Sequence, residues 1–273
     1  MLKQRVITAV VLLAVLLPAL FASNPWPFGL LTLVMVAAAG WEWGRLNGLA
    51  GAAVLMGAVV AALCAAAWYA GLVLTLWPLV AIAWIVGAAL ALRAGPGGWP
   101  KAPAALRWVL GVLMLCAAWL AMTQGKALGL NFLLSVLCLV WTADIAAYFA
   151  GRAFGRRKLA PTISPGKSWE GVYGGMAGVL LLAVLWSLAD AHFAPASLSL
   201  YSLLPARLGW PLAVLALLVL AAMSVAGDLF ESLVKRAAGA KDSSQLLPGH
   251  GGVLDRIDAL LPVLPIALAL ATL

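Results

Sequence analysis

Acidic and basic side chains gather in one stretch of this sequence, residues 227–258. Of the nine acidic residues in the chain, it contains Asp228, Glu231, Asp242, Asp255 and Asp258. It also contains Lys235, Arg236, Lys241, Arg256 and His250. Carboxylates bind Mg²⁺, and cations beside a glycine-rich turn bind phosphate. Apolar runs flank the stretch on both sides, and charge is costly near a bilayer, so we interpret it as a candidate functional site.

The spacing of these residues suggests how they are presented. Asp228, Glu231, Ser232 and Lys235 stand at i, i+3, i+4 and i+7, so on a continuous helix they share one face. An ordinary solvated helix end with a Glu231–Lys235 pair would give the same pattern. The following Pro-Gly-His-Gly-Gly segment, 248–252, allows a sharp turn whose backbone N–H groups can approach an anion. Asp255 and Asp258 then stand at the mouth of the last apolar run.

A second polar segment, residues 164–171, has the sequence Ser-Pro-Gly-Lys-Ser-Trp-Glu-Gly. Its Gly-Lys-Ser resembles part of a Walker motif, which would require glycine where this chain has Pro161 and a hydrophobic strand before it. We therefore reject a P-loop. Lys167 supplies a cation, and Ser168 could cap the next helix, whose N-terminal dipole would favour phosphate. Plain capping explains Ser168 equally well.

Two isolated residues complete the candidates. Asp144 lies deep in an apolar run, where an unpaired carboxylate is costly, so it should face the bundle interior with a partner. A metal ion or a site Lys or Arg could be that partner. His250 has no neighbouring histidine or cysteine pair, and so does not predict a zinc site.

The composition is that of a membrane protein. Of 273 residues, 65% are hydrophobic and only 10% are charged, whereas soluble domains carry about 25% charged residues. We predict an all-α polytopic bundle of about nine transmembrane helices. The predicted spans are 6–22, 28–44, 49–69, 72–92, 105–122, 130–150, 171–189, 209–227 and 257–273. Residues 1–104 would form N-terminal transmembrane helices, and 105–273 a catalytic region.

The distribution of cations orients this bundle. With nine spans, every Lys and Arg except Lys126 and Arg207 falls on one side, which the positive-inside rule makes cytoplasmic, together with the N-terminus. Segments 151–170 and 228–256 are then cytoplasmic loops that should meet on one face. The net charge of +8 therefore indicates contact with anionic lipid headgroups, and we expect no nucleic-acid partner.

The ordered polar residues resemble one family. Its signature matches Ser232, Lys235, Arg236, Lys241, Asp242, Ser244, Pro248, His250, Gly251, Gly252, Asp255, Arg256 and Asp258. This sequence resembles the phosphatidate cytidylyltransferases (CDP-diacylglycerol synthases). The 164–171 segment and the Thr-Ala-Asp around Asp144 are also similar, whereas residues 1–100 match only in being apolar.

The resemblance implies a nucleotidyltransferase of phospholipid biosynthesis, which transfers CMP from CTP to phosphatidic acid with Mg²⁺. It further implies a homodimer in a bacterial inner membrane with its active site on the cytoplasmic face. Asp228 and Asp255 would be metal-site carboxylates, with Ser232 and Lys235 as essential neighbours; these four are the catalytic candidates. Asp144 and Asp258 are further metal candidates, and a second, monovalent cation stays open. The substrate-binding candidates are Lys167, Ser168, Arg236, Lys241, His250, Gly251, Gly252 and Arg256.

Three other functions could be expected of a membrane protein with such a charged segment. A CTP-dependent lipid kinase would use the same nucleotide but attack its γ-phosphorus, and the residues alone do not exclude it. A CDP-alcohol phosphotransferase needs an Asp-Gly pair, which this chain lacks. A transporter would place ionisable residues at the midplane in broken helices, whereas only Asp144 is deep here.

Overall fold

A computed structural model describes residues 2–273, with side chains from Val6 onward. Lys3 and Arg5, which contribute to the predicted orientation, have side chains outside the described residues. The long helices are α1 (Leu2–Phe21), α2 (Trp26–Leu46), α3 (Ala53–Tyr69), α4 (Trp77–Ala94), α5 (Ala104–Leu128), α6 (Leu130–Phe154), α7 (Trp169–Phe193), α9 (Trp210–Ala237) and α11 (Leu260–Thr272). Shorter elements are α8 (Leu200–Leu208), α10 (Leu254–Ile257), two 3₁₀ turns (Ala50–Ala52 and Trp99–Lys101) and the strands β1 (Lys158–Ala160) and β2 (Ser164–Ser168).

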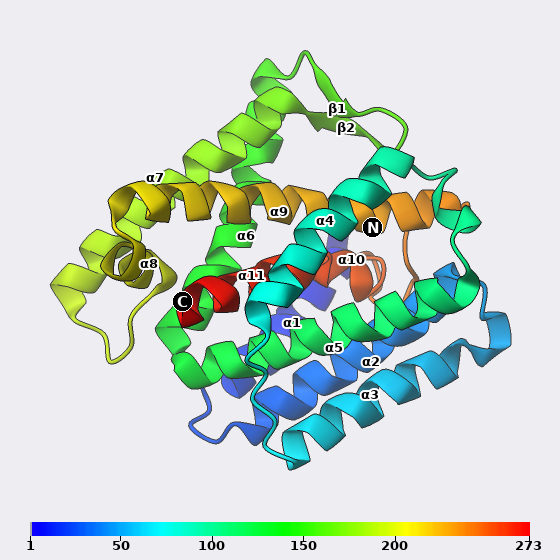
Figure 1. Ribbon diagram of the computed structural model, residues 1–273, viewed down its shortest axis with the longest axis horizontal. Helices are drawn as coiled ribbons and strands as arrows, with labels where there is room; N and C mark the ends of the chain where they lie inside the picture. Colours follow the sequence, from blue (N-terminus) through cyan, green and yellow to red (C-terminus); the bar gives the residue numbers. More distant parts are fainter. Residues whose placement is uncertain (1) are drawn as a thin grey trace.

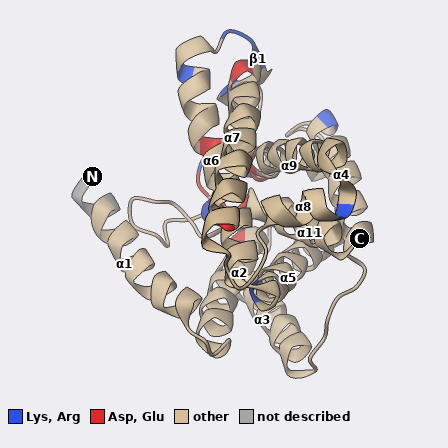
Figure 2. Ribbon diagram, turned by 90° about the vertical axis from the view of Figure 1, so that its left-hand side faces the viewer, with Lys and Arg blue, Asp and Glu red and all other residues tan. Residues whose placement is uncertain are grey.

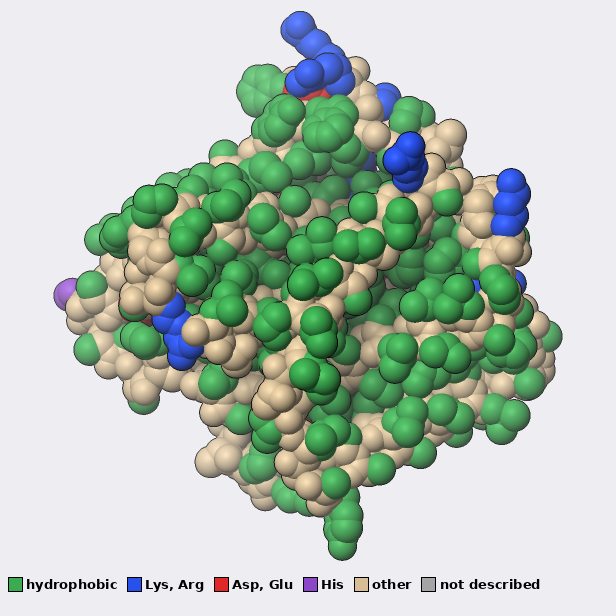
Figure 3. All heavy atoms as spheres, viewed as in Figure 1, with side chains coloured by type: hydrophobic (Ala, Val, Ile, Leu, Met, Phe, Trp, Pro, Cys, Tyr) green, Lys and Arg blue, Asp and Glu red, His purple; other side chains and the backbone are tan. Residues whose placement is uncertain are grey.

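The prediction of an all-α membrane bundle is confirmed in its class. Each predicted span overlaps one of the long helices, and within the described part of the chain 6 helices are long and apolar enough to cross a membrane. Large apolar side chains cover the outer surface, while most of the blue Lys and Arg side chains lie at its upper and right-hand edges (Figure 3). Such a surface suits lipid and not water.

Helix α9 runs across the middle of the molecule, from α8 to the segment 238–253, which we call the signature loop (Figure 1). The hydroxyl of Thr8 in α1 donates to the Pro248 carbonyl at 2.9 Å, so the first turns of α1 lie at the signature-loop end. At the opposite end, Lys126 donates to the Ala19 and Ala22 carbonyls. The first turns of α1 and the signature loop therefore lie at the same end of the bundle. Figure 2 shows α1 standing apart from the other helices.

Small residues allow α6 and α7 to pack closely. The glycines of α7 on this face are Gly171, Gly174, Gly175 and Gly178. A Cβ on Gly171 would lie 2.9 Å from the Ala147 carbonyl oxygen, and one on Gly175 would lie 2.8 Å from that of Ala143. Membrane helices without a strong hydrophobic drive to associate gain from such close backbone contact. This pair carries the β1–β2 hairpin at its tip (Figure 1).

We expect Gly175→Val to force α6 and α7 apart and to destabilise the protein by about 1–3 kcal/mol, as overpacking does. The matched control is Gly87→Val in α4, where a new Cβ meets nothing within 4 Å. It carries the same helix-propensity change and should cost less than about 1 kcal/mol. Thermal unfolding in nanodiscs, followed by tryptophan fluorescence, measures both. Equal losses would show that α6–α7 packing is not tight.

Two local elements differ from the sequence-based expectation. The residues between the predicted spans 171–189 and 209–227 were assigned no helix, but they include helix α8, with Leu200, Tyr201 and Leu204 buried. The Asp190 carboxylate accepts hydrogen bonds from the Ser199 and Ser202 hydroxyls and holds the start of α8. The hairpin β1–β2 was not predicted, because its few residues carry no alternating apolar pattern.

Candidate active site

The site is built on the end of α9, which continues ten residues beyond the predicted span to Ala237. Asp228 accepts a hydrogen bond from the Ser232 hydroxyl one turn later, at 3.3 Å. Its other oxygen pairs with Lys167 at 2.7 Å. Lys167 lies on β2, so the two polar segments meet, as predicted from their placement on one face.

Lys235, one turn further along α9, lies between two carboxylates. Its ammonium pairs with Glu231 on the same helix and with Asp255 of α10 at 2.6 Å. Glu231 is 1% exposed and Lys235 is 11% exposed, so water screens this arrangement little. Removing one partner from such a group leaves an uncompensated buried charge.

Asp255 is saturated with hydrogen-bond donors. One oxygen binds Lys235, and the other accepts from the Ser243 hydroxyl at 2.8 Å, the Ser243 N–H at 3.0 Å and the Gly252 N–H at 2.7 Å. Burial opposes ionisation, but the bonds from Lys235 and Gly252 outweigh it and lower the pKa of Asp255 to about 2. Asp255 is therefore ionised at neutral pH and fixes Lys235 against the signature loop.

Besides its ion pair with Asp228, Lys167 acts electrostatically on two further carboxylates, Asp144 and Asp258. The charges of Asp144, Asp228 and Lys167 all act on Asp258, which precedes α11. Among the described residues, no three His, Cys, Asp or Glu side chains are grouped closely enough to hold a metal ion as they stand. Their hard oxygen donors nevertheless match the chemistry of Mg²⁺.

The glycine-rich turn is closed by its own backbone. Leu247 N–H donates to the Gly251 carbonyl at 2.9 Å, and His250 N–H donates to the Leu247 carbonyl at 2.8 Å. Gly249 and Gly251 have φ of 76° and 81°, a conformation that L side chains rarely adopt. The Gly252 N–H, expected to face a phosphate, donates instead to the Asp255 carboxylate.

The remaining sequence candidates are less central. Ser168 caps α7 by accepting from Gly171 N–H at 3.2 Å. Arg236 donates to the Ile163 and Ala240 carbonyls, so it ties the hairpin segment to the end of α9. Lys241 and Arg256 are exposed, and their side chains make no hydrogen bond or ion pair with the described residues. His250 has a buried Nδ1 that makes no hydrogen bond to any described group.

Sequence reasoning missed Glu42, in α2, which is fully buried against the signature loop. Its carboxylate accepts from the Val253 N–H at 2.9 Å, the Leu254 N–H at 2.6 Å, the Ser243 hydroxyl at 3.2 Å and the Ser244 hydroxyl. A signal was present: like Asp144, it is a carboxylate within an otherwise apolar run.

Comparison with known proteins identifies the class. The sequence matches the Cytidylyltransferase family over residues 3–273, and the chain belongs to that family. A phosphatidate cytidylyltransferase of Pseudomonas aeruginosa is 42% identical, covering 99% of this chain and 97% of the relative. One from Haemophilus influenzae is 40% identical over 97% of this chain and 96% of its own length. One from Brucella suis is 48% identical, over 48% of this chain.

Proposed function

We propose that this protein is an enzyme of phospholipid biosynthesis that transfers CMP from CTP to phosphatidic acid, yielding CDP-diacylglycerol and pyrophosphate. Family membership across the chain and relatives of that name support this assignment. The observation that carries it is the convergence of the separate polar segments: Lys167 pairs with Asp228, and Lys235 joins Asp255 to the same helix.

The chemistry suits the site. A phosphate oxygen of phosphatidate attacks the α-phosphorus of CTP, the bond to the β-phosphate oxygen breaks, and pyrophosphate leaves. The attacking phosphate monoester already carries about −1.5 to −2 charges, so a strong general base is unnecessary. The difficulty is to hold two anions together, and Lys167 and Lys235 offset that repulsion and orient the reactants.

Mg²⁺ is part of this proposal. Asp228, Asp258 and Asp144 have the carboxylate chemistry to hold it, and their charges act on one another. Once bound, the ion would neutralise charge on the triphosphate. Asp255 remains a prediction as a metal ligand, since both of its oxygens already accept hydrogen bonds from protein donors. A second, monovalent cation also remains a prediction.

We also propose the setting of the reaction: a bacterial inner membrane, with the signature-loop end in the cytoplasm. The charge distribution and the bacterial relatives support it. Phosphatidate would reach the site from the inner leaflet with its acyl chains among the helices. The homodimer remains a prediction from the family resemblance, to be measured by light scattering in detergent.

The test is pyrophosphate release by purified protein with each of the four nucleoside triphosphates, with and without phosphatidate. We expect release with CTP, dependent on phosphatidate and matched by CDP-diacylglycerol. Formation of CDP and a phosphorylated lipid would instead indicate the kinase reaction. Absence of any lipid product with CTP in a folded, Mg²⁺-supplied preparation would contradict the proposal.

A further inference from the structure

Glu42 accepts hydrogen bonds from residues on both sides of the glycine-rich turn in the signature loop. One hydroxyl and one backbone N–H bind each carboxylate oxygen: Ser244 and Val253 on Oε1, Ser243 and Leu254 on Oε2. The two serines precede the glycine-rich turn 248–252, and the two N–H groups follow it. A Cβ on Gly252 would clash with both Glu42 and Ser243, so the loop closes around this carboxylate.

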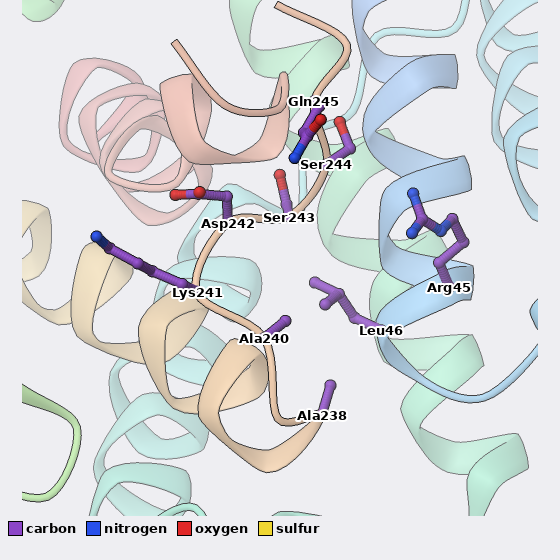
Figure 4. A pocket seen from close by; sticks show the side chains of 9 residues that line it. All are labelled: Arg45, Leu46, Ala238, Ala240, Lys241, Asp242, Ser243, Ser244 and Gln245. Atoms are coloured by element: carbon purple, nitrogen blue, oxygen red, sulfur yellow. The ribbon is translucent and has the colours of Figure 1, made fainter. Parts of the chain in front are cut away.

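Side-chain packing does not fix the loop on the side that faces the end of α2. A cavity of about 570 Å³ separates it from the end of α2, lined by residues that include Arg45, Leu46, Ala240 and Gln245. Figure 4 shows the loop passing between the ends of α9 and α2, with Leu46 and Ala240 facing each other across the space. Because side chains do not pack the loop against the end of α2 there, hydrogen bonds to Glu42 on one side and to Asp255 on the other hold this part of the loop in position.

Ser243 connects Glu42 to the catalytic candidates Asp255 and Lys235. The Ser243 hydroxyl is 3.2 Å from Glu42 and 2.8 Å from Asp255, and the Ser243 N–H also donates to Asp255. Asp255 in turn holds Lys235 at 2.6 Å. Ser244 differs in this respect: its hydroxyl contacts Glu42 and accepts from Leu246 N–H, but it makes no bond to Asp255.

We infer that Glu42 is a positioning residue for cytidylyl transfer, which acts through Ser243 to set Asp255 and Lys235 against the phosphates. This inference rests on the proposed function. Glu42 lies outside the residues that resemble the family signature, in a helix that the sequence predicts only as a membrane span. The carboxylate is required as such, because two of its four partners are backbone N–H groups that can only donate.

Glu42→Gln tests the inference in the full-length protein in nanodiscs. The variant keeps the size of the side chain but turns one acceptor into a donor that faces a backbone N–H. We expect kcat to fall by about 100-fold, the scale of a 1 Å misplacement, while KM for CTP and for phosphatidate changes by less than about threefold. A role in folding alone would lower the unfolding temperature and leave kcat intact below it; that result would overturn the inference.

A matched pair of serine variants tests the inference even if Glu42→Gln does not fold. Ser243→Ala and Ser244→Ala each remove one buried hydroxyl from Glu42, but only the first removes a bond to Asp255. We expect Ser243→Ala to lower kcat at least about tenfold more than Ser244→Ala, at similar unfolding temperatures. Equal kcat values would overturn the inference. A wild-type protein that makes no CDP-diacylglycerol would refute the proposed function instead.

Discussion

Lys235→Met lowers the rate of CDP-diacylglycerol formation by about 100- to 1,000-fold, we expect, because it removes a preorganised cation from a site that must bring two anions together. The same change leaves Glu231 and Asp255 without their shared partner. Breaking a buried ion pair in this way costs about 3–5 kcal/mol. Product formation and thermal unfolding in nanodiscs measure the two effects separately.

The double variant Glu231→Gln/Lys235→Met separates stability from catalysis. It removes the more deeply buried of the two carboxylates together with the cation, so much of the lost stability should return. Activity should stay as low as in Lys235→Met, because the missing cation is not replaced. A double variant that regains both would show that Lys235 serves the fold and not the reaction.

The second large effect is expected at Asp228. Asp228→Asn weakens the pairing with Lys167 and removes a charge from the carboxylate group around Asp258. We expect activity to fall about 100-fold and the Mg²⁺ concentration for half-maximal activity to rise at least tenfold, because a hard cation binds carboxylate far better than amide. Initial rates across a Mg²⁺ titration, after chelation of bound metal, measure both quantities.

Asp190→Asn is the control for this titration. Asp190 is a hydrogen-bonded carboxylate at the opposite end of the bundle, where it holds Ser199 and Ser202 at the start of α8. Its loss should lower stability by about 1–3 kcal/mol without changing the dependence on Mg²⁺. Identical Mg²⁺ curves for wild type and Asp228→Asn would remove Asp228 from the metal site.

Local spacing was enough to predict which polar residues share one face of a helix. Asp228, Ser232 and Lys235 share one side of α9 because helical periodicity fixes neighbours three or four residues apart. The meeting of Lys167 with Asp228 followed from topology, since the cation distribution places both segments on one side of the bundle. The apolar runs likewise predicted where the long helices lie.

Contacts that depend on tertiary packing could not be predicted in the same way. Glu42 and Ser243 are separated by 201 residues, and no local pattern pairs an α2 carboxylate with a loop after α9. Asp255 was expected to bind metal, yet its partners could be known only once Ser243 and Gly252 were in place. Helix α8 depends similarly on Asp190, an isolated acid whose serine partners lie 9 and 12 residues away.

The most direct measurement follows the fate of each CTP phosphate. Purified protein is incubated with Mg²⁺, phosphatidate and CTP labelled at either the α- or the γ-phosphate. A site that joins a lipid phosphate to the α-phosphorus predicts that α-label enters the lipid and γ-label leaves as pyrophosphate. Transfer of γ-label to lipid, or retention of α-label in CDP, would contradict it.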